Sequence, residues 1–333
     1  MKKTGKRLLA AMLLFCTILI GAAGYEVMAA DEAQSTESTS GTVNSADDLP
    51  GKRIGVQLGT TGDIYVSDYE SDGSGTVVER YNKGADAIQA LKQGKIDCVV
   101  IDEQPAIKFV EQNTGIRILD EEFTLEDYAF VVAKSNTELL DKVHSALEKL
   151  EADGTIANIQ KNYIGTADEI GKFPYESKDV SHENGTLTVG TNAEFPPYES
   201  YEDGQIVGID MDIMRAVSDE LGMELKIEDM AFDSIIPAIS TGKVDIGAAG
   251  FTVTEERKKN VNFTDTYTTS KQVIIVKDDT VTSEKVGLGE KFYDNFVKDS
   301  RYVYLLKGLG NTLLITVLAL LVGVVFGFLI AIV

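Results

Sequence analysis

Apolar runs and segments of helical periodicity alternate along the chain from residue 52 to residue 165, which is the pattern of an α/β protein. Short runs rich in aliphatic side chains predict strands at 52–58, 95–102 and 128–134. Apolar side chains three and four positions apart predict amphipathic helices at 83–94 and 139–150. A polar stretch with Gly, Pro and Ser follows at 166–186, and it predicts a linker.

The same alternation begins again after the linker. It predicts strands at 186–192, 224–229, 244–250 and 271–277, with helices at 210–222 and 232–242. A short repeat also occurs in both parts, since "ALKQGKIDCVVID" at 90–102 is echoed by "AISTGKVDIGAAG" at 238–250. We interpret each copy as a central helix-and-strand segment of one lobe of a two-lobed domain. Ligand groups are expected on loops at the carboxyl ends of parallel strands.

Both ends of the chain carry long apolar segments. Basic residues precede an apolar run at 8–20, which predicts a signal peptide at 1–29 that is either cleaved near Ala29 or retained. Cys16 is a poor lipidation site because bulky Phe15 precedes it. Residues 30–48 are polar and without pattern, so we expect a flexible leader.

The carboxyl-terminal segment has no charged residue after Lys307. Its last 21 residues or so would span about 31 Å as a helix, which matches the hydrocarbon core of a bilayer. We therefore expect a juxtamembrane connector at 278–301 and a transmembrane helix at 302–333, with the globular part on the extracytoplasmic side of the cell membrane. No basic flank follows that helix, so the chain is interpreted as a truncated piece of a longer membrane protein.

Composition excludes several function classes. The formal net charge of −22 argues against nucleic acid as a partner. Cys16 lies in the amino-terminal apolar segment and Cys98 in a predicted strand, so we expect no disulfide between them. Cys98 is expected to be a small buried apolar residue. His144 and His182 accompany no nucleophile or metal-ligand cluster, and no phosphate-binding loop is present. We therefore expect a protein that is not an enzyme and needs no cofactor or metal, with any ATP hydrolysis on a separate subunit.

Several strings resemble a known family. "TNAEFPPYES", "GIDMDIMRAVSDELG" and the highly specific "FTVTEERKKNVNFTD" resemble the first lobe of polar amino-acid-binding proteins of ABC importers, such as glutamine- and histidine-binding proteins. "LPGKRIGVQLGTTGD" and "GKIDCVVIDEQPA" resemble their second lobe, and the segment after it resembles their carboxyl tail. Residues 302–333 resemble the first helix of the matching permeases. The resemblance covers most of 49–277 and 302–333, and it implies a type II periplasmic-binding-protein fold.

The order of these segments departs from the family. The second lobe and carboxyl tail come first, at 49–165, and the first lobe follows the linker, at 187–277. We interpret this order as a circular permutation, with two damaged tandem domains as the alternative. The permutation predicts one covalent crossing between the lobes, near 124–128, with the strand at 271–277 paired beside that at 128–134.

The resemblance also implies a ligand site. A carboxylate suits the two-pronged guanidinium of Arg257, and Asp102 matches the family's ammonium partner. Thr252 and Gly250 stand where the family supplies a hydroxyl or amide for the carboxylate and a carbonyl for the ammonium. From the residues alone, Arg257 could equally be a surface charge, and Asp102 a helix cap.

The remaining candidates are implied more weakly. The resemblance places Phe195 and Phe232 on either side of the ligand side chain, although aromatic residues are more often core. Thr60 and Thr61 begin a helix whose free N–H groups favour an anion, although ordinary helix caps look the same. Asn192 is a further candidate, and Gln57 with Ile101 is expected to border the side-chain pocket.

The function implied is capture of a free polar amino acid by closure of two lobes, and its delivery to an importer. The partners implied are a permease subunit and a cytoplasmic ABC ATPase. The alternative is the ligand-binding domain of a membrane receptor, either a sensor kinase or a ligand-gated channel. An enzyme on the same scaffold is disfavoured because the expected cleft contains no histidine and no spare acid.

Overall fold

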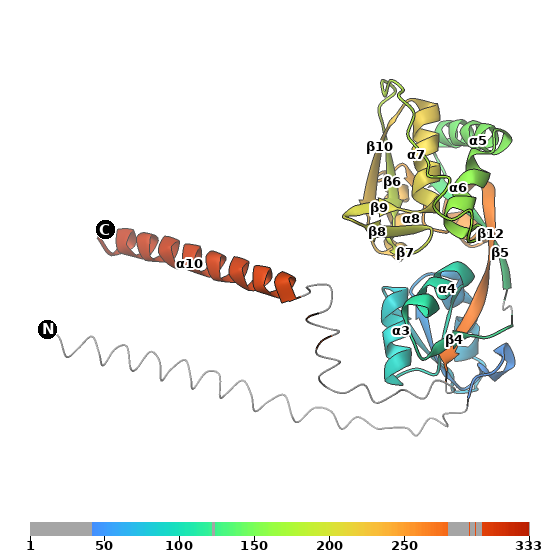
Figure 1. Cartoon of the computed structure of the whole chain (residues 1–333), viewed down its shortest axis with the longest axis horizontal. Coiled ribbons are helices and arrows are strands. Elements are labelled where there is room, and N and C mark those ends of the chain that lie inside the picture. The colour runs from blue at the N-terminus through green and yellow to red at the C-terminus, as the bar shows by residue number, and fades with distance from the viewer. Residues whose placement is uncertain (1–41, 122–123, 279–292, 294–296, 298–301, 333) are drawn as a thin grey trace. The chain divides into compact units, whose positions relative to one another are not determined.

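The computed structural model describes residues 42–121, 124–278, 293, 297 and 302–332 (Figure 1). Within these, the chain forms two compact units. Unit 1 contains residues up to 109 and residues 118–276, and unit 2 contains 110–117 and 277–333. The predicted signal peptide at 1–29 lies outside the described residues, as does most of the predicted connector at 278–301.

One sheet runs through unit 1. Its strands follow the order β10 (Glu224–Asp229), β6 (Thr186–Thr191), β11 (Ile246–Gly247), β5 (Thr124–Ala133), β12 (Val261–Lys277), β3 (Cys98–Asp102), β1 (Arg53–Gln57) and β2 (Val77–Tyr81). Pairing is parallel at the two ends, where β1 lies between β2 and β3, and β6 lies between β10 and β11. It is antiparallel in the middle, where β5 and β12 pair with each other and with the two ends.

Helices cover each end of this sheet and divide unit 1 into two halves (Figure 1). The β1 half contains β1–β3, α2 (Thr61–Ser67), α3 (Gly84–Gln93) and the start of α4 (Glu103–Gln112). The β6 half contains β6, β10 and β11 with α5 (Thr137–Ala152), α6 (Thr155–Ile164), α7 (Ile209–Leu221) and α8 (Phe232–Ser240). It also carries a small sheet of β7 (Glu194–Phe195), β8 (Glu199–Glu202) and β9 (Gln205–Val207). The predicted α/β class and two-part arrangement therefore match the observed architecture.

Apolar packing explains each half. In the β1 half, alternate residues of neighbouring strands, such as Ile54, Cys98 and Ile274, form one buried cluster. Cys98 is a free, buried thiol, as expected from its place in an apolar strand. In the β6 half, Val131, Ile235 and Phe251 belong to a second buried cluster beneath α8. Each cluster removes a continuous apolar face from water, and this burial is the main stabilising contribution.

The predicted flexible leader at 30–48 is wrong at its carboxyl end. Val43 is 2% exposed and belongs to the β1-half cluster, together with Leu49. Residues Ala46–Asp48 form a short 3₁₀ helix, and the Ala46 amide donates to Glu121 Oε2 at 2.8 Å. The prediction failed because this stretch is polar overall, whereas its one valine is buried and packs the carboxyl end of the stretch onto the core.

The predicted crossing between the halves is also corrected. Strand β5 runs from the β1 half into the β6 half, and β12 runs back, so two covalent crossings join the halves rather than one. Residues 272–276 of β12 pair with β3, whereas residues 128–133 of β5 pair with the earlier part of β12, at 261–268. The long β12 was missed because polar residues at 262–270 hide its continuity in the sequence.

The predicted linker at 166–186 contains no regular element until β6 begins at Thr186. It is nevertheless held to the end of α7. The Tyr175 hydroxyl donates to Asp219 Oδ2 at 2.7 Å, and the Lys178 amide donates to the same oxygen at 2.8 Å. Side-chain bonds of this kind fix a segment that lacks a hydrogen-bonded ladder of its own.

Unit 2 contains the helix α10 (Tyr302–Ile332), so the helix expected at 302–333 is present. Its side chains are described at 302–303, 306–321 and 323. Over the described part of the chain, no helix is both long and apolar enough to cross a membrane.

Candidate functional site

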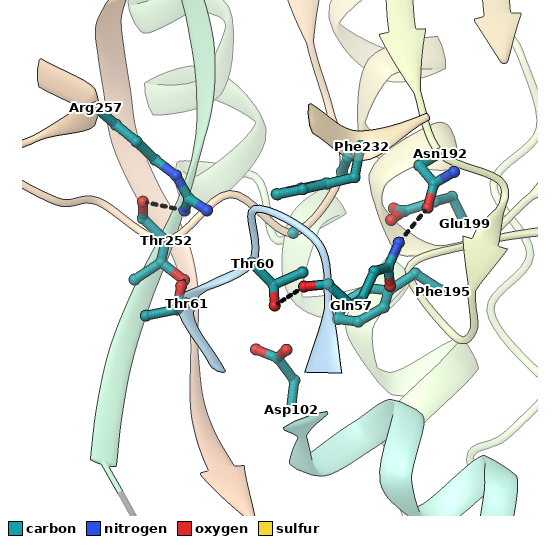
Figure 2. Close-up of a pocket in the computed structure, with 12 residues that line it drawn as sticks. Gln57, Thr60, Thr61, Asp102, Asn192, Phe195, Glu199, Phe232, Thr252 and Arg257 are labelled. Atoms are coloured by element: carbon teal, nitrogen blue, oxygen red, sulfur yellow. Dashed lines mark hydrogen bonds between the residues drawn. The ribbon is translucent and has the colours of Figure 1, made fainter. Parts of the chain in front are cut away.

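A small pocket lies between the two halves of unit 1, and its enclosed space of about 10 Å³ would hold roughly one water molecule. Twelve residues line it: Gln57, Thr60, Thr61, Asp102, Asn192, Phe195, Glu199, Phe232, Ala249, Gly250, Thr252 and Arg257 (Figure 2). Ten of the eleven residues predicted from the sequence are among them, although they come from segments up to 200 positions apart. Ile101 is not, because its buried side chain packs toward Gly84 of α3. The role of these residues in binding remains a prediction.

The β1 half contributes residues that follow its parallel strands. Gln57 ends β1 and Asp102 ends β3, so both lie at the carboxyl edge of the sheet. Thr60 caps α2: its hydroxyl accepts from the Asp63 amide at 3.4 Å and donates to the Gln57 carbonyl at 2.8 Å. Thr60 is therefore a helix cap that also faces the pocket.

In the β6 half, Gly250 has a conformation that explains its place. Its φ is +55°, and an added Cβ would lie 3.0 Å from a Phe195 ring carbon and 3.1 Å from a Tyr128 ring carbon. The Gly250 amide donates to Asp210 Oδ2 at 2.9 Å. This turn ends β11 at Gly247, earlier than the predicted strand end at 250, and it brings the following backbone to the pocket.

Arg257 is a buried cation, which contradicts the surface-charge interpretation. It is 6% exposed, and its guanidinium lies 5.4 Å from the Phe232 ring centre and 5.5 Å from that of Phe251. Nη1 donates to the Thr252 carbonyl at 2.9 Å, and Nη2 donates to the Gly59 carbonyl at 3.0 Å. Burial lowers the pKa of Arg257 from its ordinary value. No described carboxylate lies within 4.0 Å of it, so the buried charge lacks a paired anion.

Asp102 lies on the opposite side of the pocket and is also buried. The Tyr128 hydroxyl donates to its Oδ1. Burial raises the pKa of Asp102, and the hydrogen bonds from Tyr128 and Gln272 oppose this rise. A cation beside Asp102 would favour the charged carboxylate, so this position suits an ammonium group.

Glu199 lines the pocket and was not predicted, so the expectation of a cleft without a spare acid is wrong. It is 0% exposed, and neither of its carboxylate oxygens has a hydrogen-bond partner in the described structure. Burial, reinforced by Asp210 and Asp102, raises its pKa well above the ordinary value. Gln57 Oε1 is likewise buried without a partner. The sequence contained one signal for Glu199, namely that it is an acid four residues after the pocket candidate Phe195.

Hydrogen bonds join the two halves across the pocket. Gln57 Nε2 donates to Asn192 Oδ1 at 2.8 Å, and Thr61 Oγ1 donates to Thr252 Oγ1 at 2.7 Å (Figure 2). Lys83 of the β1 half and Glu194 of the β6 half also form an ion pair of 2.5 Å. The two halves therefore meet around the pocket in a closed arrangement.

The two aromatic candidates both line the pocket, and each also packs on another ring. Phe195 stacks on Tyr198 with a ring-centre distance of 5.8 Å, and Phe232 stacks on Phe251 at 4.8 Å. No group of three potential metal-binding side chains occurs among the described residues. The pocket is therefore an aromatic and acidic cavity with one buried guanidinium.

Residues 187–303 match the family model of bacterial extracellular solute-binding proteins, family 3. The chain is 44% identical over 84 residues to an arginine-binding protein of Corynebacterium glutamicum, covering 25% of this chain and 28% of that protein. It is 29% identical over 135 residues to an L-cystine-binding protein of Escherichia coli, covering 40% and 50%. These matches support a polar amino-acid solute-binding domain in this part of the chain.

Solved structures show the same partial likeness. The arginine-bound form of a truncated arginine-binding protein from T. maritima is 48% identical, with 23% of this chain and 37% of that chain covered and a TM-score of 0.23. The chain spans between 28% and 50% of the length of the curated relatives it matches first.

Proposed function

We propose that this protein captures a free cationic amino acid, of the arginine class, outside the cytoplasm and delivers it to an ABC importer. The two halves of unit 1 close on the ligand. Arg257 holds its carboxylate, Asp102 holds its ammonium group, and Glu199 faces its cationic side chain. Relatives named as arginine-binding and the family match at 187–303 support the solute class.

The observation that carries this proposal is the charge balance of the pocket. Arg257 is the buried cation, whereas Asp102 and Glu199 are buried acids on the same lining. The partnerless oxygens on the lining, Gln57 Oε1 and both oxygens of Glu199, are acceptors. Buried charges and acceptors are costly until they are paired. A dibasic amino acid supplies one carboxylate for Arg257 and two cationic donor groups for the acids.

We further propose that the chain order is a circular permutation of the family's order and that permease and ATPase subunits act with it. A family model describes its segments in one fixed order. A chain that carries those segments in another order can match over only one of them, so the match at 187–303 agrees with a permuted chain. Both halves of unit 1 nevertheless complete one sheet and share two crossing strands. This arrangement favours permutation over two damaged tandem domains.

Titration calorimetry of the full chain tests the substrate class. L-arginine should bind at least tenfold more tightly than L-citrulline, its neutral analogue of nearly the same shape. Glu199→Gln should abolish this preference, because a buried charged partner typically contributes ~2–5 kcal/mol. Glu202→Gln is the matched control, since Glu202 lies on the same strand but is exposed. Equal affinities for the two ligands in the unmodified protein would refute the assignment.

A further inference from the structure

The ion pair between Lys83 and Glu194 joins the two halves of unit 1 outside the pocket lining. Lys83 is the residue before α3 in the β1 half, and Glu194 begins β7 in the β6 half. Lys83 Nζ lies 2.5 Å from Glu194 Oε1. Neither residue lines the pocket, whereas the hydrogen bonds described above between the halves come from lining residues. A ligand in the pocket therefore does not replace this contact.

The backbone around Glu194 is held to the β6 half and to the pocket wall. Strand β7 pairs with β8, and the Glu194 amide donates to the Asn192 carbonyl at 2.7 Å. The preceding amide, that of Ala193, donates to Asp229 Oδ1 at 3.0 Å. Phe195 follows directly and lines the pocket. The position of the Glu194 carboxylate is thus tied to the position of one wall of the pocket.

The backbone around Lys83 is held in the same way to the β1 half. Gly84 begins α3, and an added Cβ there would lie 2.9 Å from an Ile101 side-chain carbon, so the start of the helix packs closely on β3. The carbonyl of Asn82 accepts from Gln57 Nε2 at 3.2 Å. Because each charged residue is anchored in its own half, the ion pair must break when the halves separate.

The surrounding charges favour this pair, and solvent reaches it. Glu194 raises the pKa of Lys83 most, and Asp86 and Asp229 act in the same direction. A cation of the β1 half therefore faces two acids of the β6 half, Glu194 and Asp229. The side chains of Lys83 and Glu194 are 49% and 32% exposed, so dissolved salt screens their attraction.

We propose that Lys83 and Glu194 form a latch whose opening slows the release of a bound amino acid. The enclosed space of the pocket, about 10 Å³, holds roughly one water molecule, so an amino acid enters or leaves only when the halves separate. Separation breaks the latch, which adds to the barrier for release. Lys and Glu have long, flexible side chains, so the pair can persist while the pocket widens around a ligand. This inference rests on the proposed function in one respect, namely that the halves close on an amino acid.

A latch and electrostatic steering predict different kinetic patterns. Lys83→Ala and Glu194→Ala both break the latch, so each should raise the dissociation rate constant for L-arginine roughly 1.4- to 5-fold, as expected for an exposed pair. The two variants change the local charge in opposite directions, so steering of a cationic ligand would move their association rate constants in opposite directions. The double variant Lys83→Glu with Glu194→Lys restores the pair with reversed sign and should restore slow release.

Stopped-flow tyrosine fluorescence of the full chain, which has 13 tyrosines and no tryptophan, measures both rate constants. The observed rate plotted against L-arginine concentration gives the association rate constant as its slope and the dissociation rate constant as its intercept. Raising NaCl from about 20 mM to about 500 mM should speed release from the unmodified protein and from the double variant, but not from Lys83→Ala. Lys95→Ala, an exposed position just past the other end of α3, and Glu202→Ala, exposed on β8, are the matched controls.

Tight binding of L-arginine with unchanged release in both single variants overturns the inference and leaves the proposed function intact. Opposite changes in their dissociation rate constants also overturn it, as does a double variant that releases as fast as the single variants. If L-glutamine binds and L-arginine does not, the substrate class fails, and the same rate measurements with L-glutamine decide the role of the latch. A chain that binds neither amino acid overturns both proposals.

Discussion

Arg257→Ala is the perturbation that most directly tests how the pocket holds a carboxylate. The side chain is buried, its two terminal nitrogens donate to carbonyls from opposite halves, and no described carboxylate pairs with it. Removing one partner of a desolvated charge pair typically costs ~2–5 kcal/mol. At about 1.4 kcal/mol per decade, this predicts a loss in affinity for L-arginine between roughly thirtyfold and several thousandfold.

The same substitution also affects folding, and the two effects must be separated. The Thr252 and Gly59 carbonyls lose their charged donor, at a cost of ~1.5–3 kcal/mol each. Against this, a desolvated cation is removed, whose burial already lowers the pKa of Arg257. We therefore expect a folded variant with a reduced melting temperature, and binding is to be measured by calorimetry well below that temperature.

Two further variants sharpen the measurement. Arg257→Lys keeps the positive charge but has no planar two-pronged group, so it should bind more weakly than the unmodified protein and more tightly than Arg257→Ala. Lys258→Ala is the matched control, because Lys258 is the next residue and is exposed. A folded Arg257→Ala protein that binds L-arginine within about threefold of the unmodified affinity would falsify the assigned carboxylate site.

Other substitutions test the fold and the pH response. Val43→Ser should lower the free energy of unfolding by ~1–3 kcal/mol in urea titrations, whereas Val77→Ser, at a position 42% exposed, should change it little. Gly250→Ala should weaken L-arginine binding in calorimetry and destabilise the fold more than Gly73→Ala does, since both glycines have positive φ but only Gly250 is crowded. Burial raises the pKa of Asp210 to about 7, so the folded state holds an extra proton below that pH. Stability should therefore fall as pH rises from about 4 through 7, and Asp210→Asn should flatten the melting-temperature profile.

The arrangement of the site could be predicted from the sequence because it depends on local patterns and a family resemblance. Gln57 and Asp102 end apolar runs, and parallel strands bring their carboxyl ends to one edge. Arg257 stands in the string with the most specific resemblance, so its place was expected although its burial was not. These positions follow from strand ends, which periodicity locates well.

The missed features share a different physical origin. Val43, Glu126 and Glu199 are buried by segments distant in sequence. No local pattern marks Val43 and Glu126, and the only signal for Glu199 is its place four residues after Phe195. The alternation of β5 places Glu126 inward and Leu125 and Asp127 outward, but the interior there is the boundary between two halves, which only the assembled sheet defines. A period of two tells which residues share a face, not which face is covered.

The buried acids show why the same tertiary burial makes a solute site. An acid in a loop is normally solvated, and the sequence alone favours that interpretation of Glu199. Closure of the two halves removes water from Glu199, Asp102 and Glu126 at once, so each either binds a proton or meets a cation. In the proposed function, a ligand with two cationic groups pairs two of these acids, and its carboxylate pairs Arg257. On this proposal, the ligand whose charges complement the closed pocket stabilises it most, so selectivity and closure would depend on the same few buried groups.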